Sequence, residues 1–151
     1  MAMMGAKDGE RGRHGARGKT VAHALYRRVA FNVLISNVDD HLRNHGFLWL
    51  GKAGWSLSPA YDLNPVPTDV KARVLTTNID LDEGTSSLDL LEEAAGFFAL
   101  TLAQARAIIK EVATSTATWR KTAKAVGARS AEINHLCSRT MLLGAKVRAA
   151  I

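Results

Sequence analysis

Cysteine, proline and long apolar runs are all scarce in this 151-residue chain, and two of these shortages exclude whole classes of protein. The single cysteine, Cys137, excludes an internal disulfide framework and a multi-cysteine zinc site. No stretch approaches the roughly 18 continuous apolar residues that a membrane-spanning helix needs, so we expect no membrane partner. The first residues lack the apolar core of a secretory signal, which leads us to expect a cytoplasmic protein.

What is present is the composition of a folded domain, with 47% hydrophobic and 23% charged residues. Chains that stay disordered combine low hydrophobicity with high net charge, so this composition excludes wholesale disorder. Residues 1–19 differ from the rest, because they contain no Leu, Ile, Val or aromatic side chain and cannot bury a face. We therefore predict a flexible basic arm over residues 1–19 and one domain over residues 20–151.

The chain as a whole is basic, with a formal net charge of +6 at pH 7. This balance is compatible with a polyanionic partner such as nucleic acid. The basic arm, however, has no aromatic side chains between its charges, and these are what single-strand binding uses. We expect nucleic acid to be contacted only indirectly, and a non-catalytic interaction module stays open as an alternative function.

Hydrophobic periodicity predicts a mainly helical α+β domain. Near the start of the domain, the apolar positions repeat every four residues at Val21, Leu25, Val29 and Val33. This spacing predicts a helix over residues 20–35, whose last two turns are apolar nearly all round, as in a central core helix. The helix leads directly into the polar residues 36–45, so we expect this polar loop to be anchored at the edge of the core.

A β-hairpin is expected after the polar loop. Two short strand-like runs, residues 47–50 and 55–58, flank a Gly-containing turn. Trp49 and Trp55 should face each other across this hairpin. All three prolines lie between residues 59 and 67 and predict an irregular stretch, and residues 73–79 suggest one further short strand.

The last third of the chain is expected to be helical. Capping signals precede each expected helix, namely Ser86 or Ser87, then Thr101 with Gln104 as a capping box, and finally Ser130. The first of these helices covers residues 88–98. The second is a long helix that ends near Gly127.

Three residues in and after the polar loop carry the chemistry, namely Asp39, Asn44 and Asp62. Phosphoryl transfer from ATP needs a carboxylate that orients the acceptor hydroxyl and takes its proton. It also needs oxygen ligands, from an amide and a second carboxylate, for the magnesium ion that neutralises the phosphates. Kinase catalytic loops place the base Asp and the metal-binding Asn five residues apart, with the metal-binding Asp beyond a short hairpin. The three residues stand in this order and spacing.

The longer string around these residues resembles the C-terminal lobe of the HipA family, serine/threonine kinases that act as toxins in bacterial toxin–antitoxin pairs. The resemblance rests on FNVLISNVDDHLRNHGFL at residues 31–48 and on WSLSPAYDLNP at residues 55–65. It extends over roughly residues 20–141. It implies a protein-kinase-like C-terminal lobe that uses ATP and Mg²⁺ as cofactors.

The resemblance also implies roles for single residues. Asp39 matches the catalytic aspartate, and Asn44 and Asp62 match the residues that bind Mg²⁺ with the nucleotide. His41 would fix the loop by hydrogen bonds, and Arg43 would contact phosphate. Asp40, which lies inside the motif, is expected only to cap or solvate the loop.

The family further implies partners for this chain. Its members phosphorylate a protein hydroxyl on a translation component, and a DNA-binding antitoxin of the HipB type restrains them. The sequence contains no Gly-rich phosphate loop between strands, and no strand before residue 20 that would carry an ATP-anchoring lysine. We therefore expect little or no kinase activity from this chain alone, with an N-terminal lobe from another chain as a possible partner.

One alternative enzyme class uses the same loop. Asp39, Asp40, His41 and His45 would form the metal site of a metal-dependent hydrolase or nuclease, with the two histidines four residues apart. Such a histidine pair suits zinc on a regular helix with a third ligand. The glycine that directly follows His45 argues against a helix here.

Overall fold

The computed structural model describes residues 14–66, 74–80 and 83–140, with side chains described from residue 18 to residue 135. The α-helices in these residues are α1 (His14–Ile35), α2 (Leu88–Glu93), α3 (Leu102–Thr116), α4 (Trp119–Ala125) and α5 (Ser130–Thr140). The short 3₁₀ helices are η1 (Leu42–Asn44), η2 (Gly51–Ala53) and η3 (Ala94–Phe98), and the strands are β1 (Phe47–Trp49) and β2 (Trp55–Leu57). This architecture confirms the predicted mainly α, α+β class.

Helix α1 ends at Ile35, as predicted, but it begins at His14, six residues before the predicted start at Thr20. Gly15 and Gly18 suggested a flexible arm over this stretch. The Ala, Arg and Lys residues between and after them are good helix formers, and a helix that has already nucleated extends at low cost. Part of the predicted arm is therefore helical, and residues 1–13 lie outside the described residues.

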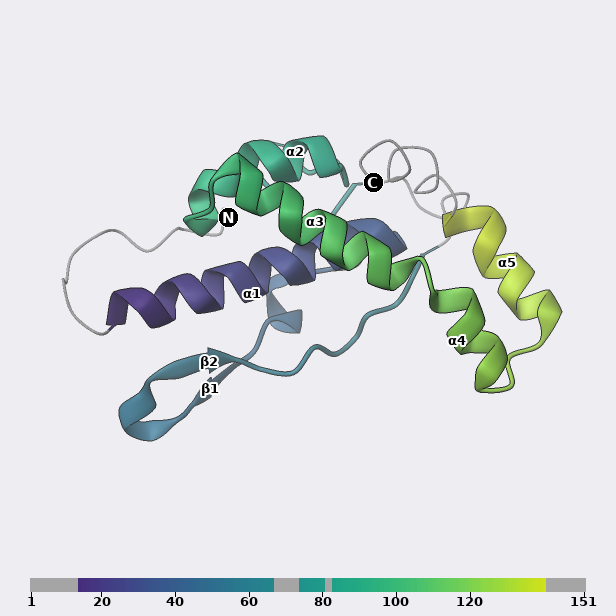
Figure 1. The fold of residues 1–151 in the computed structure, drawn as a ribbon, viewed down its shortest axis with the longest axis horizontal. Helices are drawn as coiled ribbons and strands as arrows, with labels where there is room; N and C mark the ends of the chain where they lie inside the picture. The colour runs from purple at the N-terminus through teal and green to yellow at the C-terminus, as the bar shows by residue number, and fades with distance from the viewer. Residues whose placement is uncertain (1–13, 67–73, 81–82, 141–151) are drawn as a thin grey trace.

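The apolar core lies where α1, α2, η3 and α3 come together (Figure 1). Tyr26 of α1 is fully buried there and meets Phe98 edge-on, with the ring centroids 5.2 Å apart. The Tyr26 hydroxyl donates a hydrogen bond to the Leu91 carbonyl at 3.1 Å. Burial raises the pKa of Tyr26, and the nearby Glu92 raises it further, so this phenol stays a neutral donor.

The predicted hairpin is confirmed. Strands β1 and β2 pair antiparallel, with Trp49 opposite Trp55, and the two ring centroids lie 5.2 Å apart. The connection between the strands is the single turn η2 followed by Gly54, whose φ of 79° is in the left-handed region that favours glycine. Figure 1 shows the hairpin on the side of α1 opposite to α3.

The further strand suggested for residues 73–79 is absent from the described part of that stretch, residues 74–79. Val74 forms only an isolated bridge with Thr85. Leu75 N still donates to the Gly84 carbonyl at 2.7 Å, but Thr76 and Thr77 donate to the carbonyls of Val38 and Asp40 at 3.1 and 3.2 Å. The segment therefore supports the polar loop and does not extend a sheet.

The helix predicted over residues 88–98 divides into α2 and η3, because the chain tightens to 3₁₀ geometry at Ala94. Its predicted cap is confirmed at Ser87, whose Oγ accepts a hydrogen bond from Asp89 N at 3.2 Å. The capping box at the start of α3 is confirmed as well, with Thr101 and Gln104 each bonding the other's backbone amide.

The long helix predicted from the capping box to Gly127 is wrong in one respect, because it breaks between Thr116 and Trp119 into α3 and α4. The break falls in a run of Ser and Thr residues. Thr116 Oγ1 donates to the Val112 carbonyl at 2.7 Å, and Thr118 Oγ1 donates to the Ser115 carbonyl at 2.8 Å. Such bonds compete with the helical backbone pattern and favour a bend.

Helices α4 and α5 pack on each other beyond the end of α3 (Figure 1). Gly127 follows α4 with a φ of 90°, which confirms the predicted stop. Helix α5 begins at Ser130, and the Arg129 amide at its start donates to the Glu132 carboxylate at 2.8 Å, so Ser130 is the first helical residue and not the cap. None of the helices in the described residues is long and apolar enough to cross a membrane.

Candidate active site

The end of α1 positions the polar loop that follows it. The helix closes in a Schellman motif, in which Asn37 N donates to the Asn32 carbonyl at 2.9 Å and Ser36 N donates to the Val33 carbonyl at 3.3 Å. Ser36 takes a φ of 58°, the conformation that glycine usually supplies here. Asn37 Nδ2 donates to Asn32 Oδ1 at 3.2 Å, and the Ser36 carbonyl accepts from Val66 N at 3.0 Å.

The predicted catalytic aspartate and the predicted amide ligand share this loop. Asp39 is exposed, whereas Asn44, in η1, is only 5% exposed. Asn44 Nδ2 donates to the Asp39 carbonyl at 3.5 Å, and Asn44 N donates to the His41 carbonyl at 2.8 Å. Because Nδ2 faces the loop backbone, Oδ1 is the side-chain atom of Asn44 that can ligate a cation.

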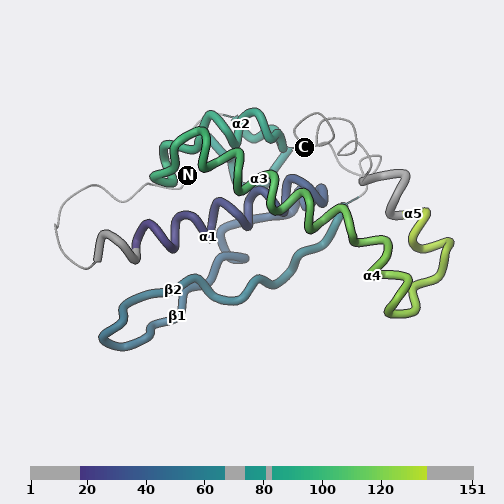
Figure 2. Tube along the Cα trace, in the orientation of Figure 1, coloured from purple at the N-terminus to yellow at the C-terminus, as the bar shows by residue number. Residues whose placement is uncertain are grey.

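The segment of Asp62, which follows the hairpin in sequence, lies against the same polar loop. Figure 2 shows the chain after β2 returning beside α1. Asn37 Nδ2 donates to the Asp62 carbonyl at 3.4 Å, and the Tyr61 hydroxyl donates to the Arg43 carbonyl at 2.6 Å. Asp62 has a φ of 57°, and its Oδ1 accepts from Asn64 Nδ2 at 2.7 Å. A left-handed residue other than glycine costs about 1–2 kcal/mol, and such strain concentrates at functional sites.

A buried charged cluster lies against this loop, and the sequence did not predict it. Asp40, expected to cap or solvate the loop, is only 4% exposed, and its Oδ1 lies 3.0 Å from Nε2 of His45. Arg28 of α1 donates through Nη2 to the Ser58 carbonyl at 2.5 Å. Burial lowers the pKa of Arg28, while Asp40 and Tyr61 oppose that shift. The expectation for Asp40 was wrong because the loop folds back on α1, and no local pattern signals that.

The two remaining predicted residues, His41 and Arg43, line a cleft of about 340 Å³ together with residues 76–78. The Arg43 side chain is exposed. Nδ1 of His41 is buried and has no hydrogen-bond partner among the described residues. The observed contribution of His41 to the loop is its carbonyl, which accepts from Asn44 N, so the phosphate-contact and loop-fixing roles of these side chains stay predictions.

The structure gives no support to the alternative metal site of a hydrolase. The described residues contain no group of three or more His, Cys, Asp or Glu side chains placed to hold a metal ion. Asp40 and His45 face each other in the buried pair, and η1 lies between them, so the two histidines do not share a regular helix. The spacing of four residues alone was therefore misleading.

The donor set of the candidate site fits Mg²⁺. It consists of oxygen atoms only, from the amide of Asn44 and the carboxylate of Asp62. Mg²⁺ prefers such hard donors, keeps several waters, and is usually held by one or two protein groups together with substrate phosphates. An exposed carboxylate, Asp62, and a buried amide, Asn44, are donors of the kind that such a site uses.

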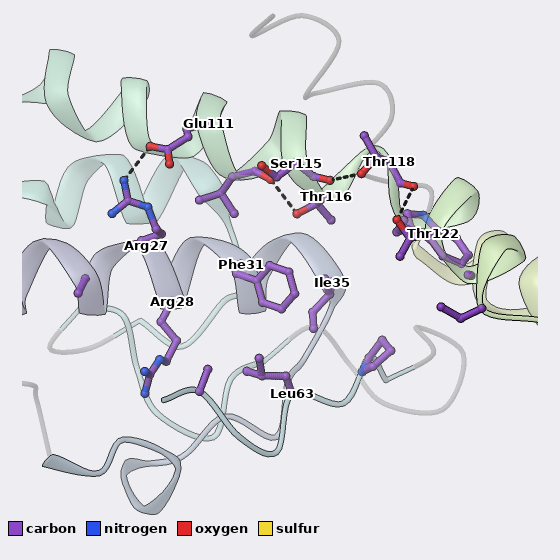
Figure 3. Close-up of a pocket in the computed structure, with 17 residues that line it drawn as sticks. Arg27, Arg28, Phe31, Ile35, Leu63, Glu111, Ser115, Thr116, Thr118 and Thr122 are labelled. Carbon is purple, nitrogen blue, oxygen red and sulfur yellow. Dashed lines mark hydrogen bonds and ion pairs between the residues drawn. The ribbon is translucent and has the colours of Figure 1, made fainter. Parts of the chain in front are cut away.

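A groove of about 860 Å³ lies on the other side of the Asp62 segment, between α1, α3, α4 and residues 60–65. Figure 3 shows Phe31 and Ile35 of α1 and Leu63 directed into it, while Arg28 points toward the chain after β2. None of the three predicted catalytic and metal-binding residues lines this groove. It is therefore separate from the candidate site.

Sequence reasoning singled out Asp39, Asn44 and Asp62 but not the groups that contact their segments. Asn37 and Tyr61 each contact the segment of a predicted residue, and both lie inside the two strings that carried the resemblance. Arg28 lies outside both strings, and only the fold brings it to Asp40. A signal for Tyr61 was its position directly before Asp62.

Comparison with known protein families gives one match. The family model described as HipA-like C-terminal domain matches residues 11–120 of the chain. Neither a curated protein nor a solved structure matches the chain. The matched range contains α1, the polar loop, the hairpin and all three central residues of the candidate site.

Proposed function

Because this chain belongs to the HipA-like C-terminal domain family, we propose that it is the catalytic lobe of a serine/threonine protein kinase. In this proposal, Asp39 orients the acceptor hydroxyl of a protein and takes its proton. Asn44 and Asp62 hold the Mg²⁺ that accompanies ATP. A translation component as the acceptor and a DNA-binding antitoxin of the HipB type as the partner belong to the proposal by resemblance.

The observation that carries this proposal is the way one distant segment, that of Asp62, is tied to the polar loop. The bond from Asn37 to the Asp62 carbonyl and the bond from Tyr61 to the Arg43 carbonyl connect the segment of Asp62 to the loop. The bond from Asn44 to the Asp39 carbonyl orders the loop itself. Phosphoryl transfer depends mainly on positioning and electrostatic stabilisation, so a preformed arrangement of these groups supports it.

The exposure of Asp39 and the burial of Asn44 suit their different proposed roles. Asp39 is exposed and so can meet a hydroxyl that another protein presents, whereas the Asn44 amide is buried and held by the loop backbone. When bound, Mg²⁺ supplies charge neutralisation to the phosphates. Asn44 and Asp62 supply the oxygen atoms that fix its place.

A nucleotide-binding lobe, from another part of a longer protein or from another chain, belongs to the proposal. Phe47, Trp49 and Trp55 lie on one face of the hairpin and are 50%, 61% and 56% exposed. Contiguous exposed apolar surface of this kind marks interaction sites. The hairpin connects the segments of Asn44 and Asp62 along the chain, so a lobe that docks on it binds next to both segments in sequence.

The proposal is tested by titrating Mg·ATP into the purified chain in a calorimeter. We expect saturable binding with a dissociation constant on the order of 1 mM or tighter, and loss of that binding in Asp62→Asn. Asp89→Asn is the matched control, because Asp89 is an exposed carboxylate on α2, outside the site. An absence of binding to the unmodified chain, or equal binding to Asp62→Asn, contradicts the proposal.

The need for a second lobe leads to a separate prediction about kinase activity. The purified chain alone should transfer little or no radiolabelled phosphate from ATP to itself or to an added protein. Transfer at a readily measured rate by this chain would contradict the need for a second lobe, while leaving the assignment of the metal ligands intact.

A further inference from the structure

Two buried ionisable side chains bracket the predicted catalytic turn without taking part in the proposed chemistry. Asp40 lies before η1 and His45 directly after it, and they are 4% and 8% exposed. Oδ1 of Asp40 lies 3.0 Å from Nε2 of His45, so this contact closes the turn across its base. The turn closed in this way carries Asn44 at its last position.

The pair is held from both sides by other elements. Arg28 of α1 interacts electrostatically with Asp40, and it bonds the Ser58 carbonyl just after the hairpin. Figure 3 shows the Arg28 side chain extending from α1 toward that part of the chain. On the other side, Thr77 N donates to the Asp40 carbonyl at 3.2 Å. Asp40 is therefore bonded through its carbonyl to a segment outside the loop.

Stability alone is a poor reason for such a pair. Moving two ionisable groups out of water is costly, and apolar residues of similar volume often serve stability equally well or better. An apolar contact is satisfied over a range of distances and rotations. Asp40 Oδ1 and His45 Nε2 instead approach to 3.0 Å, and this contact ties the two ends of the turn to one separation, although it does not have the geometry of an aligned hydrogen bond.

We infer that Asp40 and His45 are positioning residues, whose mutual contact sets the place of the Asn44 amide and of the neighbouring Asp39 in the candidate site. Neither side chain touches the metal or the nucleotide in this role. Both act through the turn between them. The inference rests on the proposed function, because the group being positioned is a proposed ligand of Mg²⁺.

The first test compares two replacements of His45 by Mg·ATP titration and thermal unfolding. His45→Leu fills the space but cannot bond Asp40, and we expect it to weaken Mg·ATP binding by about tenfold or more, as losses of supporting residues around metal ligands do. His45→Gln keeps a side-chain N–H that can donate to the Asp40 carboxylate. It should therefore retain binding within about threefold of the unmodified chain.

The double variant Asp40→Val/His45→Leu separates positioning from stability. It removes both polar partners, so its unfolding temperature should recover relative to His45→Leu. Its affinity for Mg·ATP should remain about tenfold or more below that of the unmodified chain. Recovery of affinity together with the unfolding temperature would overturn the inference, because the pair would then serve stability only.

A measurement without nucleotide keeps this inference distinct from the proposed function. In the ligand-free chain, amide hydrogen exchange of Asn44 and His45 should accelerate in His45→Leu and in the double variant, but not in His45→Gln. Amides of α3 report general destabilisation and should change little in the double variant. Unchanged exchange at Asn44 in both Leu variants would overturn the inference even if the unmodified chain binds Mg·ATP. A failure of the unmodified chain to bind would count against the proposed function alone.

Discussion

Two regions of the described chain are built on opposite principles. Between residues 88 and 116, every buried side chain is apolar, with Leu91 and Ile109 among them. Between residues 32 and 45, the buried polar or charged residues are Asn32, Ser36, Asn37, Asp40, Asn44 and His45. The first region holds its form by filling volume. The second combines a few side-chain bonds, such as that from Asn37 Nδ2 to Asn32 Oδ1, with buried polar atoms that have no hydrogen-bond partner among the described residues. Of the groups proposed for chemistry, Asn44 is one of its buried residues.

Backbone strain follows the same division, with one informative exception. Ser36 and Asp62 are left-handed residues in or beside the polar region. Ala99 is also left-handed, with a φ of 56°, but it is an exposed residue that ends η3 in the apolar region. Ser36 and Ala99 therefore share a backbone conformation but differ in burial. Comparing the stability gained when each is replaced by glycine shows the effect of the buried Ser36 side chain.

The largest effect is expected in the apolar region, from Leu91→Ala. Leu91 is fully buried, so its truncation should lower the free energy of unfolding by about 3 kcal/mol through lost burial and the cavity left behind. Leu91→Met, which conserves volume, should cost less than about 1.5 kcal/mol. Urea unfolding followed by circular dichroism measures both changes. Similar losses for Met and Ala would show that this region is not governed by volume.

Asn32→Leu makes the opposite comparison in the polar region. This substitution also nearly conserves volume, but it removes the Oδ1 that accepts from Asn37 Nδ2. A buried donor left unpaired should lower the free energy of unfolding by about 2 kcal/mol, as measured by the same urea titration. Asn32→Asp keeps an acceptor oxygen but buries an uncompensated carboxylate at neutral pH, so it should lose at least as much. Equal stability of Asn32→Leu and the unmodified chain would remove the distinction between the two regions.

Replacing the left-handed residues by glycine should stabilise the chain. Ser36→Gly removes both the side-chain strain and a buried Oγ that has no hydrogen-bond partner among the described residues, so we expect a gain of about 1 kcal/mol. Ala99→Gly relieves strain only, and the gain should be about 0.5 kcal/mol. Thermal unfolding of the two variants gives the ranking. A larger gain for Ala99→Gly would mean that the Ser36 hydroxyl is satisfied in solution.

The smallest effect concerns an exposed carboxylate and contrasts with buried Asp40. Hydrogen bonds from the Thr85 hydroxyl and amide lower the pKa of Glu83. A carboxylate with a depressed pKa in the folded state contributes stability above its unfolded value of about 4.3. That contribution is lost as the pH falls through the folded pKa. Thr85→Val should move the NMR titration midpoint of the Glu83 carboxyl carbon upward, and an unmoved midpoint would assign the shift to other groups.

Local signals in the sequence predicted those elements whose causes are local. The capping box at Thr101, the Ser87 cap and the cross-strand pair of Trp49 and Trp55 each depend on residues close in sequence, and all three are confirmed. The break after Thr116 was missed because the apolar spacing continues through it, while the hydroxyl groups bond the backbone.

The central residues of the candidate site could be singled out from the sequence, but the burial of the residues around them could not. Asp39, Asn44 and Asp62 stand in a spacing that chemistry recognises, but the burial of Asp40 depends on contacts with distant residues. Arg28 of α1 acts on it electrostatically, and Thr77 N donates to its carbonyl. Polar residues of a loop carry no periodicity that separates exposed from buried positions, so only the folded chain distinguishes Asp39 from Asp40.

The hydrogen bond between the Ser36 carbonyl and Val66 N has a consequence for how this fold can vary among its relatives. This bond closes a loop of the chain that runs from Ser36 to Val66, and the entire hairpin lies within that loop. Doubling the length of a flexible closed loop costs only about 0.6 kcal/mol in closure entropy. Insertions at the hairpin tip, residues 51–54, can therefore change how far the hairpin extends while leaving the helical core and both anchored ends of this segment in register.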